Sequence, residues 1–443
     1  MPVRTPSGEA ARGDGCGTGR RRLGGRRARR IPPPWLPPTF LLRQGLSLVL
    51  LAGLTGWTRL PSWIVRYGLK CVPGAAGAVG MGCIGFPNHP VWEVTTECNQ
   101  ECRHCHVSAG RPLPGELDTD QGRRLIDELA AVRAFRMLAY TGGEPLLRKD
   151  LFDLLAHSSE RGFTNTLATN ATLVDRSVAR DLRRRGVAIA AVSLDGADPD
   201  THDRRRGRRG SFETALSGMR HLREAGILLH VNITVVEEDL GRLQRLIALG
   251  ESLGAGIILV YQLVPQGRGR ALDGEAFGRD ANERLMAFLA EAQRKSSAVL
   301  EPVAGPQYWA TLLRRAGISG GPLLRAAEKV FHGCCAGRGF VYIKSDGTVW
   351  PCAFVPIDCG SVRHSSFLEI WERSPQLAAL RCESRSFNER CGGCAYARVC
   401  GGCRGRAYAR CGNFAGDDPG CFIQPPAKIA ARQSPFMEVQ DAN

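Results

Sequence analysis

The stretch Glu97-Cys98-Asn99-Gln100-Glu101-Cys102-Arg103-His104-Cys105 directly follows Trp92–Thr95, a short run that predicts a β-strand. The cysteines have the spacing C-x3-C-x2-C, and three thiolates from one short loop can bind three irons of a cubane [4Fe–4S] cluster. No fourth cysteine follows nearby, so one iron would keep an open position for substrate, as catalytic zinc sites do. A structural zinc site is the alternative, and it would need His104 or His106 as a further ligand.

Around this loop, from residue 89 onward, apolar runs alternate with helix-like segments. The runs that predict strands are Trp92–Thr95, Met137–Thr141, Thr164–Thr169, Val187–Ser193, Leu229–Thr234 and Ile257–Leu263. The segments that predict helices are Thr119–Ala134, Lys149–Arg161, Asp175–Arg185, Ser211–Ala225 and Gly241–Leu253. Such alternation indicates βαβ units and a parallel sheet. We therefore predict an α/β fold, a partial (βα)6 TIM-like barrel, with the chemistry at the carboxyl ends of its strands.

Further motifs lie where these strands are expected to end. Gly142-Gly143-Glu144-Pro145 follows the second strand, Thr169-Asn170 ends the third, and Ser193-Leu194-Asp195-Gly196 ends the fourth. His202-Asp203-Arg204-Arg205-Arg206-Gly207 comes shortly afterwards. Together with the cysteine loop, these motifs resemble those of the radical S-adenosylmethionine (SAM) family.

The resemblance implies a catalytic role for Cys98, Cys102 and Cys105. The open iron of their cluster would bind the amino and carboxylate groups of SAM, and reductive cleavage would give a 5′-deoxyadenosyl radical. It also implies a set of SAM-binding residues, namely Gly142, Gly143, Glu144, Pro145, Asn170, Ser193, Asp195 and Arg206. In this set, the glycines allow close backbone approach, Glu144 accepts from the SAM ammonium group, and Arg206 pairs with its carboxylate.

Other interpretations of these residues stay open. Asn170 is also compatible with an ordinary turn, Ser193 with a helix cap and Arg206 with a solvated basic loop. Ala171 follows Asn170 where the family usually has glycine.

The last quarter of the chain holds a second group of cysteines, which begins at Cys334 and Cys335 and ends at Cys421. It resembles the SPASM extension of radical SAM enzymes, which holds one or two auxiliary [4Fe–4S] clusters. The five residues between its CxxC pairs are too few for an independent zinc ribbon, whose pairs lie about 15–20 residues apart. The resemblance gives one cluster Cys391, Cys394, Cys400 and Cys421. It gives the other Cys334 (or Cys335), Cys352 and Cys403, with no clear fourth ligand.

The remaining cysteines of this region, Cys359, Cys382 and Cys411, are expected to pack as small apolar residues.

Several stretches resemble the enzymes of alternative heme and d-type heme synthesis, among them Tyr261–Pro265, Trp350-Pro351-Cys352 and Phe367–Trp371. That branch removes propionate side chains from iron tetrapyrroles. Arginine suits carboxylate recognition, and the candidate partners are Arg268, Arg270, Arg404 and Arg406, although surface arginines would look the same. The alternatives are a SPASM maturase acting on a ribosomal peptide and a non-catalytic iron–sulfur electron carrier.

These assignments divide the chain of 443 residues into expected parts. They are a disordered basic tail (1–40), a helical and Gly-rich extension (41–88), a radical SAM core (89–275), a connecting helical segment (276–333), a SPASM domain (334–425) and a tail (426–443). The net charge of +16 does not predict nucleic-acid binding, because much of it lies in the arginine-rich tail.

The expected partners are the substrate and a reduced donor of the flavodoxin or ferredoxin type. The run Gly45–Trp57 is too short to span a bilayer, but weak membrane-surface association through residues 41–70 is an alternative. Grouped cysteines and oxygen-sensitive clusters indicate an oxidoreductase or lyase of the reducing cytoplasm.

Overall fold

The computed structural model describes residues 89–423, except 133, 134, 136, 297, 331, 332 and 382–388. The predicted tails at 1–40 and 426–443, the 41–88 extension with its proposed membrane contact, and Cys382 lie outside the described residues. Within the described part of the chain, every helix is too short or too polar to cross a membrane.

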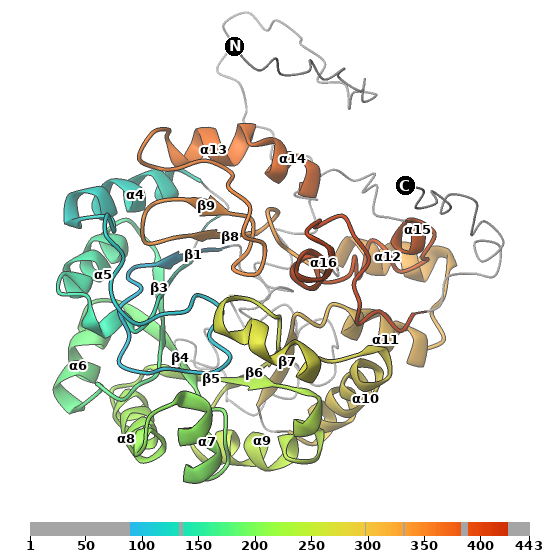
Figure 1. The fold of residues 1–443 in the computed structure, drawn as a ribbon, viewed down its shortest axis with the longest axis horizontal. Helices are drawn as coiled ribbons and strands as arrows, with labels where there is room; N and C mark the ends of the chain where they lie inside the picture. The colour runs from blue at the N-terminus through green and yellow to red at the C-terminus, as the bar shows by residue number, and fades with distance from the viewer. Residues whose placement is uncertain are drawn as a thin grey trace, which may run out of the picture.

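A curved sheet with helices on its outer side forms the body of the molecule (Figure 1). The strand order is β7-β6-β5-β4-β3-β2-β1-β8-β9, and all neighbours are parallel except β8 and β9. The strands are β1 (His89–Glu93), β2 (Met137–Thr141), β3 (Thr164–Thr169), β4 (Val187–Ser193), β5 (Leu228–Val235), β6 (Ile257–Gln262), β7 (Val299–Val303), β8 (Phe340–Ile343) and β9 (Val349–Trp350). The predicted α/β partial barrel is confirmed.

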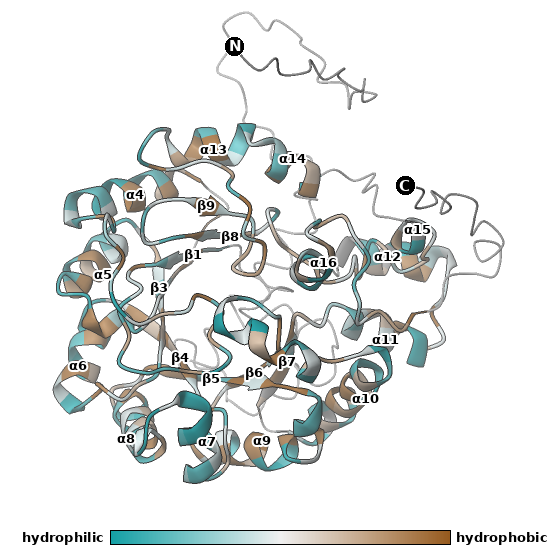
Figure 2. Ribbon diagram, in the orientation of Figure 1, coloured by the Kyte–Doolittle hydropathy of each residue, from teal (hydrophilic) through white to brown (hydrophobic). Residues whose placement is uncertain are grey.

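The α-helices of the barrel cover the outside of the sheet and connect its strands. They are α4 (Thr119–Ala131), α5 (Leu151–Glu160), α6 (Arg176–Arg184), α7 (Pro199–Arg206), α8 (Ser211–Glu224), α9 (Leu243–Ser252) and α10 (Arg279–Lys295). Figure 2 shows several of them hydrophilic on one side and hydrophobic on the other. Their apolar sides bury one continuous core with the strands, including Trp92, Tyr140 and Leu154, because burying apolar surface is the main driving force of folding.

Short 3₁₀ helices occur at three loops next to the strand ends. They are η1 (Pro145–Leu147), η2 (Glu237–Gly241) and η3 (Gly267–Glu275). The first follows the predicted Gly-Gly-Glu-Pro motif, and Pro145 occupies its first turn, where a missing backbone N–H costs nothing.

The chain after β6 departs from the expected helical connection, because the strand β7 lies within residues 276–333. Helices α11 (Gln307–Arg315) and α12 (Gly321–Val330) follow it. Strand β8 then pairs with β1 on the opposite edge of the sheet. The C-terminal cysteine region is therefore joined to the barrel by main-chain hydrogen bonds beside the strand that leads into the first cysteine loop.

The C-terminal region contains α13 (Phe367–Arg373), α14 (Pro375–Arg381), α15 (Glu389–Gly392) and α16 (Arg404–Cys411). Helix α13 packs on α4 of the barrel, where Phe135 contacts the rings of Phe367 and Trp371. Helix α16 begins at Arg404, and the Cys403 thiol caps it by accepting from the backbone N–H of Arg406.

Candidate active site

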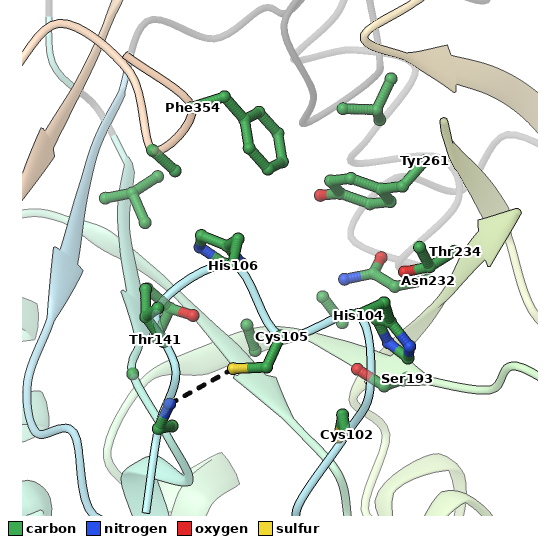
Figure 3. Close-up of a pocket in the computed structure, with 18 of the residues that line it drawn as sticks. Cys102, His104, Cys105, His106, Thr141, Ser193, Asn232, Thr234, Tyr261 and Phe354 are labelled. Carbon is green, nitrogen blue, oxygen red and sulfur yellow. Dashed lines mark hydrogen bonds between the residues drawn. The ribbon is translucent and has the colours of Figure 1, made fainter. Parts of the chain in front are cut away.

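The three cysteines of the first loop line one cavity of about 250 Å³. Figure 3 shows Cys102 and Cys105 on the loop beside this cavity, with a backbone N–H directed at the Cys105 sulfur. This N–H belongs to Ala109 and lies 3.4 Å from Sγ. The structure therefore brings Cys98, Cys102 and Cys105 to one space.

Hydrogen bonds to its backbone fix the cysteine loop, and several of them come from Arg268. The Cys98 N–H donates to the Gly110 carbonyl over 2.9 Å. Arg268, at the start of η3, donates its backbone N–H to the Cys105 carbonyl and its Nε to the Cys102 carbonyl, each over 2.9 Å. Its Nη1 donates to the Ala109 carbonyl over 2.6 Å. Arg268 thus holds the loop, whereas the sequence suggested it only as a propionate partner.

The two glycines after β2 are required by the backbone of the same loop. A Cβ on Gly142 would lie 2.3 Å from the Thr95 carbonyl oxygen, and a Cβ on Gly143 would lie 2.1 Å from that of Glu97. Both glycines also line the cavity. The two glycines therefore permit close approach between the chain segments after β1 and β2. They also leave the backbone there accessible to a ligand in the cavity.

The Glu144 carboxylate lies behind the cavity wall and not among the lining residues. It is fully buried and accepts from the Thr169 hydroxyl and the Asn170 backbone N–H, each over 2.8 Å. Burial raises the pKa of Glu144 to about 7, although these two hydrogen bonds act to lower it. Glu144 therefore ties the ends of β2 and β3 together. Pro145 is also buried behind the lining.

Asn170 and Ser193 line the cavity at the ends of β3 and β4. The Asn170 side-chain amide donates to the Asn99 side chain over 2.7 Å, which connects β3 to the cysteine loop. Ala171 adopts a left-handed conformation, with φ of 60°, at the position where the family usually has glycine. The loop there keeps the glycine-type geometry without the glycine.

A buried charge pair joins α7 to the end of β4. Arg206 Nη2 lies 2.6 Å from Asp195 Oδ2, and Arg206 Nη1 donates to Cys102 Sγ over 3.5 Å. His104 Nε2 lies 3.1 Å from the same Asp195 oxygen. Burial alone would raise the pKa of Asp195, but the Arg206 cation and His104 hold it well below its usual range. Arg206 is a buried cavity residue, so the solvated-loop alternative is wrong for it.

The cavity continues into an aromatic half that sequence reasoning did not predict. Figure 3 shows the rings of His106, Phe354 and Tyr261 around its far side. His106 contacts Phe354 and Tyr342 through its ring, with centroids 5.3 and 6.2 Å apart. Burial lowers the pKa of His106 to about 4, so its imidazole is neutral at pH 7.

Two polar residues of β5, Asn232 and Thr234, line the cavity as well. Their spacing of two along a predicted strand places both side chains on its inner face, and this alternation is the signal that could have found them. The Asn232 side-chain oxygen is buried without a hydrogen-bond partner, as are Gln100 Nε2 and Arg206 Nε in the same lining. Buried polar atoms of this kind fit a site that a polar ligand completes.

The other arginines suggested for propionate binding differ in position. Arg404 and Arg406 are almost fully buried, so the surface interpretation is wrong for them, and neither lines the cavity. Arg406 lies 2.8 Å from Asp418 Oδ2, and Arg404 donates to the Phe414 and Gly416 carbonyls. Arg270 is exposed and does not line the cavity.

The C-terminal cysteines lie in more than one apolar cluster, and Cys403 packs with Val264 and Ala304 in a cluster that lacks Cys334 and Cys352. Burial raises the pKa of the Cys400 thiol well above its usual value, and the nearby Cys421 and Cys391 sulfurs raise it further. Cys394 and Cys421 are likewise near one another. Cys334 and Cys352 share a separate apolar cluster, and Cys352 also lines the cavity.

Two cysteines expected to pack as small apolar residues differ from each other. Cys359 is buried in the main core. Cys411 is exposed at the end of α16, so the prediction is wrong for it. Among the described residues, no three His, Cys, Asp or Glu side chains gather around a single metal-ion position.

Comparison with known proteins agrees with this geometry. Residues 92–249 match the model of the radical SAM superfamily, and residues 334–395 match that of an iron–sulfur cluster-binding domain, SPASM. The chain is 36% identical to an AdoMet-dependent heme synthase of Methanosarcina barkeri, over 78% of this chain and all of the relative. It is 32% identical to a pre-heme d1 synthase of Dinoroseobacter shibae, over 75% of this chain and 85% of the relative.

More distant likenesses extend to peptide-modifying proteins. The chain is 30% identical to the mycofactocin maturase MftC of Mycobacterium ulcerans, over 79% of this chain and 92% of the relative. The solved structure of Streptococcus suis SuiB bound to its precursor peptide SuiA superimposes with a TM-score of 0.59, over 76% of this chain and 75% of that one, at 19% identity.

The chain belongs to the radical SAM family and carries the SPASM extension. Within that family, its similarity to the heme synthase and the pre-heme d1 synthase confirms the predicted resemblance. It is therefore an enzyme that binds SAM and [4Fe–4S] clusters. The residues fit these groups, because three thiols line a cavity that also holds unpartnered buried polar atoms.

Proposed function

We propose that this enzyme cleaves SAM reductively and uses the resulting radical to decarboxylate propionate side chains of an iron tetrapyrrole. One observation carries the proposal: a single cavity is lined by the three loop cysteines, by Cys352 and by the rings of Tyr261 and Phe354. A planar macrocycle packs well on aromatic side chains. The identity to heme synthases supports the same substrate class.

For SAM itself, we propose that Gly142, Gly143, Asn170 and Ser193 contact the molecule directly, since all four line the cavity beside the cysteines. Arg206 would pair with the SAM carboxylate, because its Nε is buried without a partner. Three predicted residues would act through their neighbours. These are Glu144, Pro145 and Asp195.

When bound, the first cluster supplies the electron that breaks a C–S bond of SAM, and an auxiliary cluster supplies an acceptor for the electron that decarboxylation leaves. The protein's own contribution is to join both ends in one cavity. Cys352 and Tyr342 are buried at the aromatic end, and the Cys105 and Cys352 sulfurs both act to raise the pKa of Tyr342. We also propose the two auxiliary ligand sets predicted from the sequence, the domain boundaries given there, and a reduced flavodoxin- or ferredoxin-type donor.

Incubation with a tetrapyrrole tests the substrate. The reconstituted enzyme, SAM and a reductant are mixed with iron-coproporphyrin or with didecarboxysiroheme. The molecular masses of the products are then measured by mass spectrometry. The expected result is loss of one carbon dioxide and two hydrogen atoms for each propionate that reacts, because one hydrogen atom goes to the 5′-deoxyadenosyl radical, one electron to the acceptor and the carboxyl proton to solvent. Unchanged mass of both compounds, while 5′-deoxyadenosine still forms, contradicts the tetrapyrrole assignment.

A second candidate is modification of a ribosomally made peptide, which the identity to mycofactocin maturase favours. The identity to this maturase, 30%, is lower than the 36% identity to the heme synthase. We therefore rank the peptide second. Mass change in a co-encoded small peptide, with none in the tetrapyrroles, would reverse the order.

A further inference from the structure

The outer side of the first cysteine loop lies against the end of α7. The Glu101 and Arg103 backbone N–H groups donate to the Arg206 and Arg205 carbonyls, each over 3.1 Å. A Cβ on Gly207 would lie 2.7 Å from the Glu101 carbonyl oxygen, so the two segments are in close contact. The last residues of α7 and Gly207 therefore lie against one side of the first cysteine loop.

Exposed arginines from three segments meet at this place. Arg208 is exposed, and its Nη1 donates to the Asn99 carbonyl of the loop over 2.6 Å. Arg103 is exposed within the loop itself, and Arg111 is exposed directly after Gly110, which accepts from Cys98. The set of exposed arginines, called the arginine rim here, is Arg103, Arg111, Arg204, Arg208 and Arg209.

Fewer carboxylates than arginines lie here, although Glu101 is exposed in the loop itself, beside Gly207. In the part of the chain that the structure describes, Arg204, Arg208 and Arg209 form no ion pair, and Arg103 reaches Glu275 only at 4.0 Å. The nearby Asp203 carboxylate is directed to the backbone, because it accepts from the Gly210 and Phe212 N–H groups. Helix α7 is hydrophilic along its length (Figure 2). The arginine rim is thus a surface beside the first cysteine loop on which exposed arginines outnumber the exposed carboxylates Glu101 and Glu275.

We propose that the arginine rim docks an acidic one-electron carrier protein, which reduces the first cluster from this side. One electron leaves the reduced carrier and enters the cluster, so the carrier is oxidised by one electron and no atom is transferred. Complementary charge at a docking face raises the association rate by about 10- to 1,000-fold at low salt and loses this effect as salt screens it. The inference rests on the enzyme class and holds for either substrate.

The target variant is Arg204→Glu/Arg209→Glu, which leaves the Arg208 contact to the loop intact. Its matched control is Arg180→Glu/Arg220→Glu, which makes the same charge change at exposed positions on α6 and α8. Anaerobic stopped-flow mixing with a reduced acidic flavodoxin follows bleaching of the cluster. Affinity for the oxidised flavodoxin is measured separately, and dithionite serves as a reductant that needs no docking face.

With flavodoxin at low salt, we expect the cluster of the target variant to be reduced at a rate at least about tenfold lower than that of the wild type. The target variant should also bind flavodoxin more weakly. The control should change less than about twofold, dithionite should reduce all three proteins alike, and high salt should remove the difference. Equal loss in both variants, or equal loss with dithionite, overturns the proposal. So does a target variant that keeps flavodoxin reduction but loses binding to duplex DNA, because the rim would then serve a nucleic acid.

Discussion

The two cysteine regions are held in place by different means. Cys98, Cys102 and Cys105 lie on one short loop that main-chain and side-chain bonds attach to the end of β3, to α7 and to η3. The cysteines from Cys391 to Cys421 lie in a stretch whose described helices are only α15 and α16. The barrel therefore preforms the first site, whereas the second depends on a few buried contacts and on its metal.

One buried carboxylate joins much of the second region. Asp418 Oδ2 accepts from the Cys403 backbone N–H over 2.7 Å, from Gln307 Nε2 over 2.6 Å and from Arg406 Nη2 over 2.8 Å. Burial would raise the pKa of Asp418, but Arg406 and these hydrogen bonds hold it below its usual value. The region around Cys403 is thus organised by the buried Arg406–Asp418 ion pair.

The largest effect is expected from Asp418→Ala, because it leaves the buried Arg406 cation without its partner. Breaking a buried pair in this way costs about 3–5 kcal/mol. We expect loss of auxiliary iron and an earlier unfolding transition, measured by iron analysis and urea denaturation, while the first cluster persists. The exposed neighbour gives the control Asp417→Ala, which should behave as wild type. If both variants keep their iron, Asp418 does not organise the region.

An intermediate effect is expected from Gly143→Ala, which changes the contacts of the first cysteine loop. The added Cβ would lie 2.1 Å from a carbonyl oxygen of the cysteine loop, and such overpacking costs about 1–3 kcal/mol. Iron analysis should show the first cluster depleted and the auxiliary iron retained, the reverse of Asp418→Ala. Gly110→Ala is the matched control, because a Cβ there meets nothing within 4 Å. Equal loss in the two glycine variants would speak against a preformed first site.

The smallest effect concerns the barrel alone. His230 on β5 is fully buried, and neither of its ring nitrogens has a hydrogen-bond partner. Burial lowers the pKa of His230 to about 3. Below about pH 6.5 the unfolded chain therefore binds a proton at this imidazole, whereas the folded chain does not. Stability must therefore fall as pH falls, by about 1 kcal/mol between pH 7 and pH 5.5 from this residue.

Urea denaturation of His230→Leu at several pH values measures this contribution. The variant should show a flatter dependence of stability on pH than the wild type, and the exposed His364→Leu should not. The auxiliary iron should be unchanged in both. An identical slope in wild type and His230→Leu would show that the buried imidazole is not the source.

Sequence reasoning placed most of the barrel, because its strands are apolar runs between polar helices. The bounds of β2, β3 and β4 match the prediction. It missed β7, which contains Glu301 and Pro302, residues that are uncommon in strands. It also missed α7, whose sequence Pro199–Arg206 lacks apolar periodicity and is stabilised by the cap at Asp198.

The candidate site was predicted where local motifs carry it and missed where distant elements meet. The cysteine loop and Gly142 lie at the cavity as predicted. Tyr261 and Phe354 reach it from β6 and from the loop after β9, and no local pattern marks that meeting. Arg406 was misjudged because arginine is usually exposed, and its burial depends on Asp418, which lies on a separate turn of the chain.

We propose that Cys98, Cys102 and Cys105 hold the cluster that cleaves SAM, while the C-terminal cysteines hold separate iron. Replacing all three with alanine, followed by reconstitution and assay with SAM and dithionite, tests this directly. We expect the iron content to fall by one cluster, the auxiliary iron to remain, and no 5′-deoxyadenosine to form. Continued formation of 5′-deoxyadenosine by this variant would contradict it.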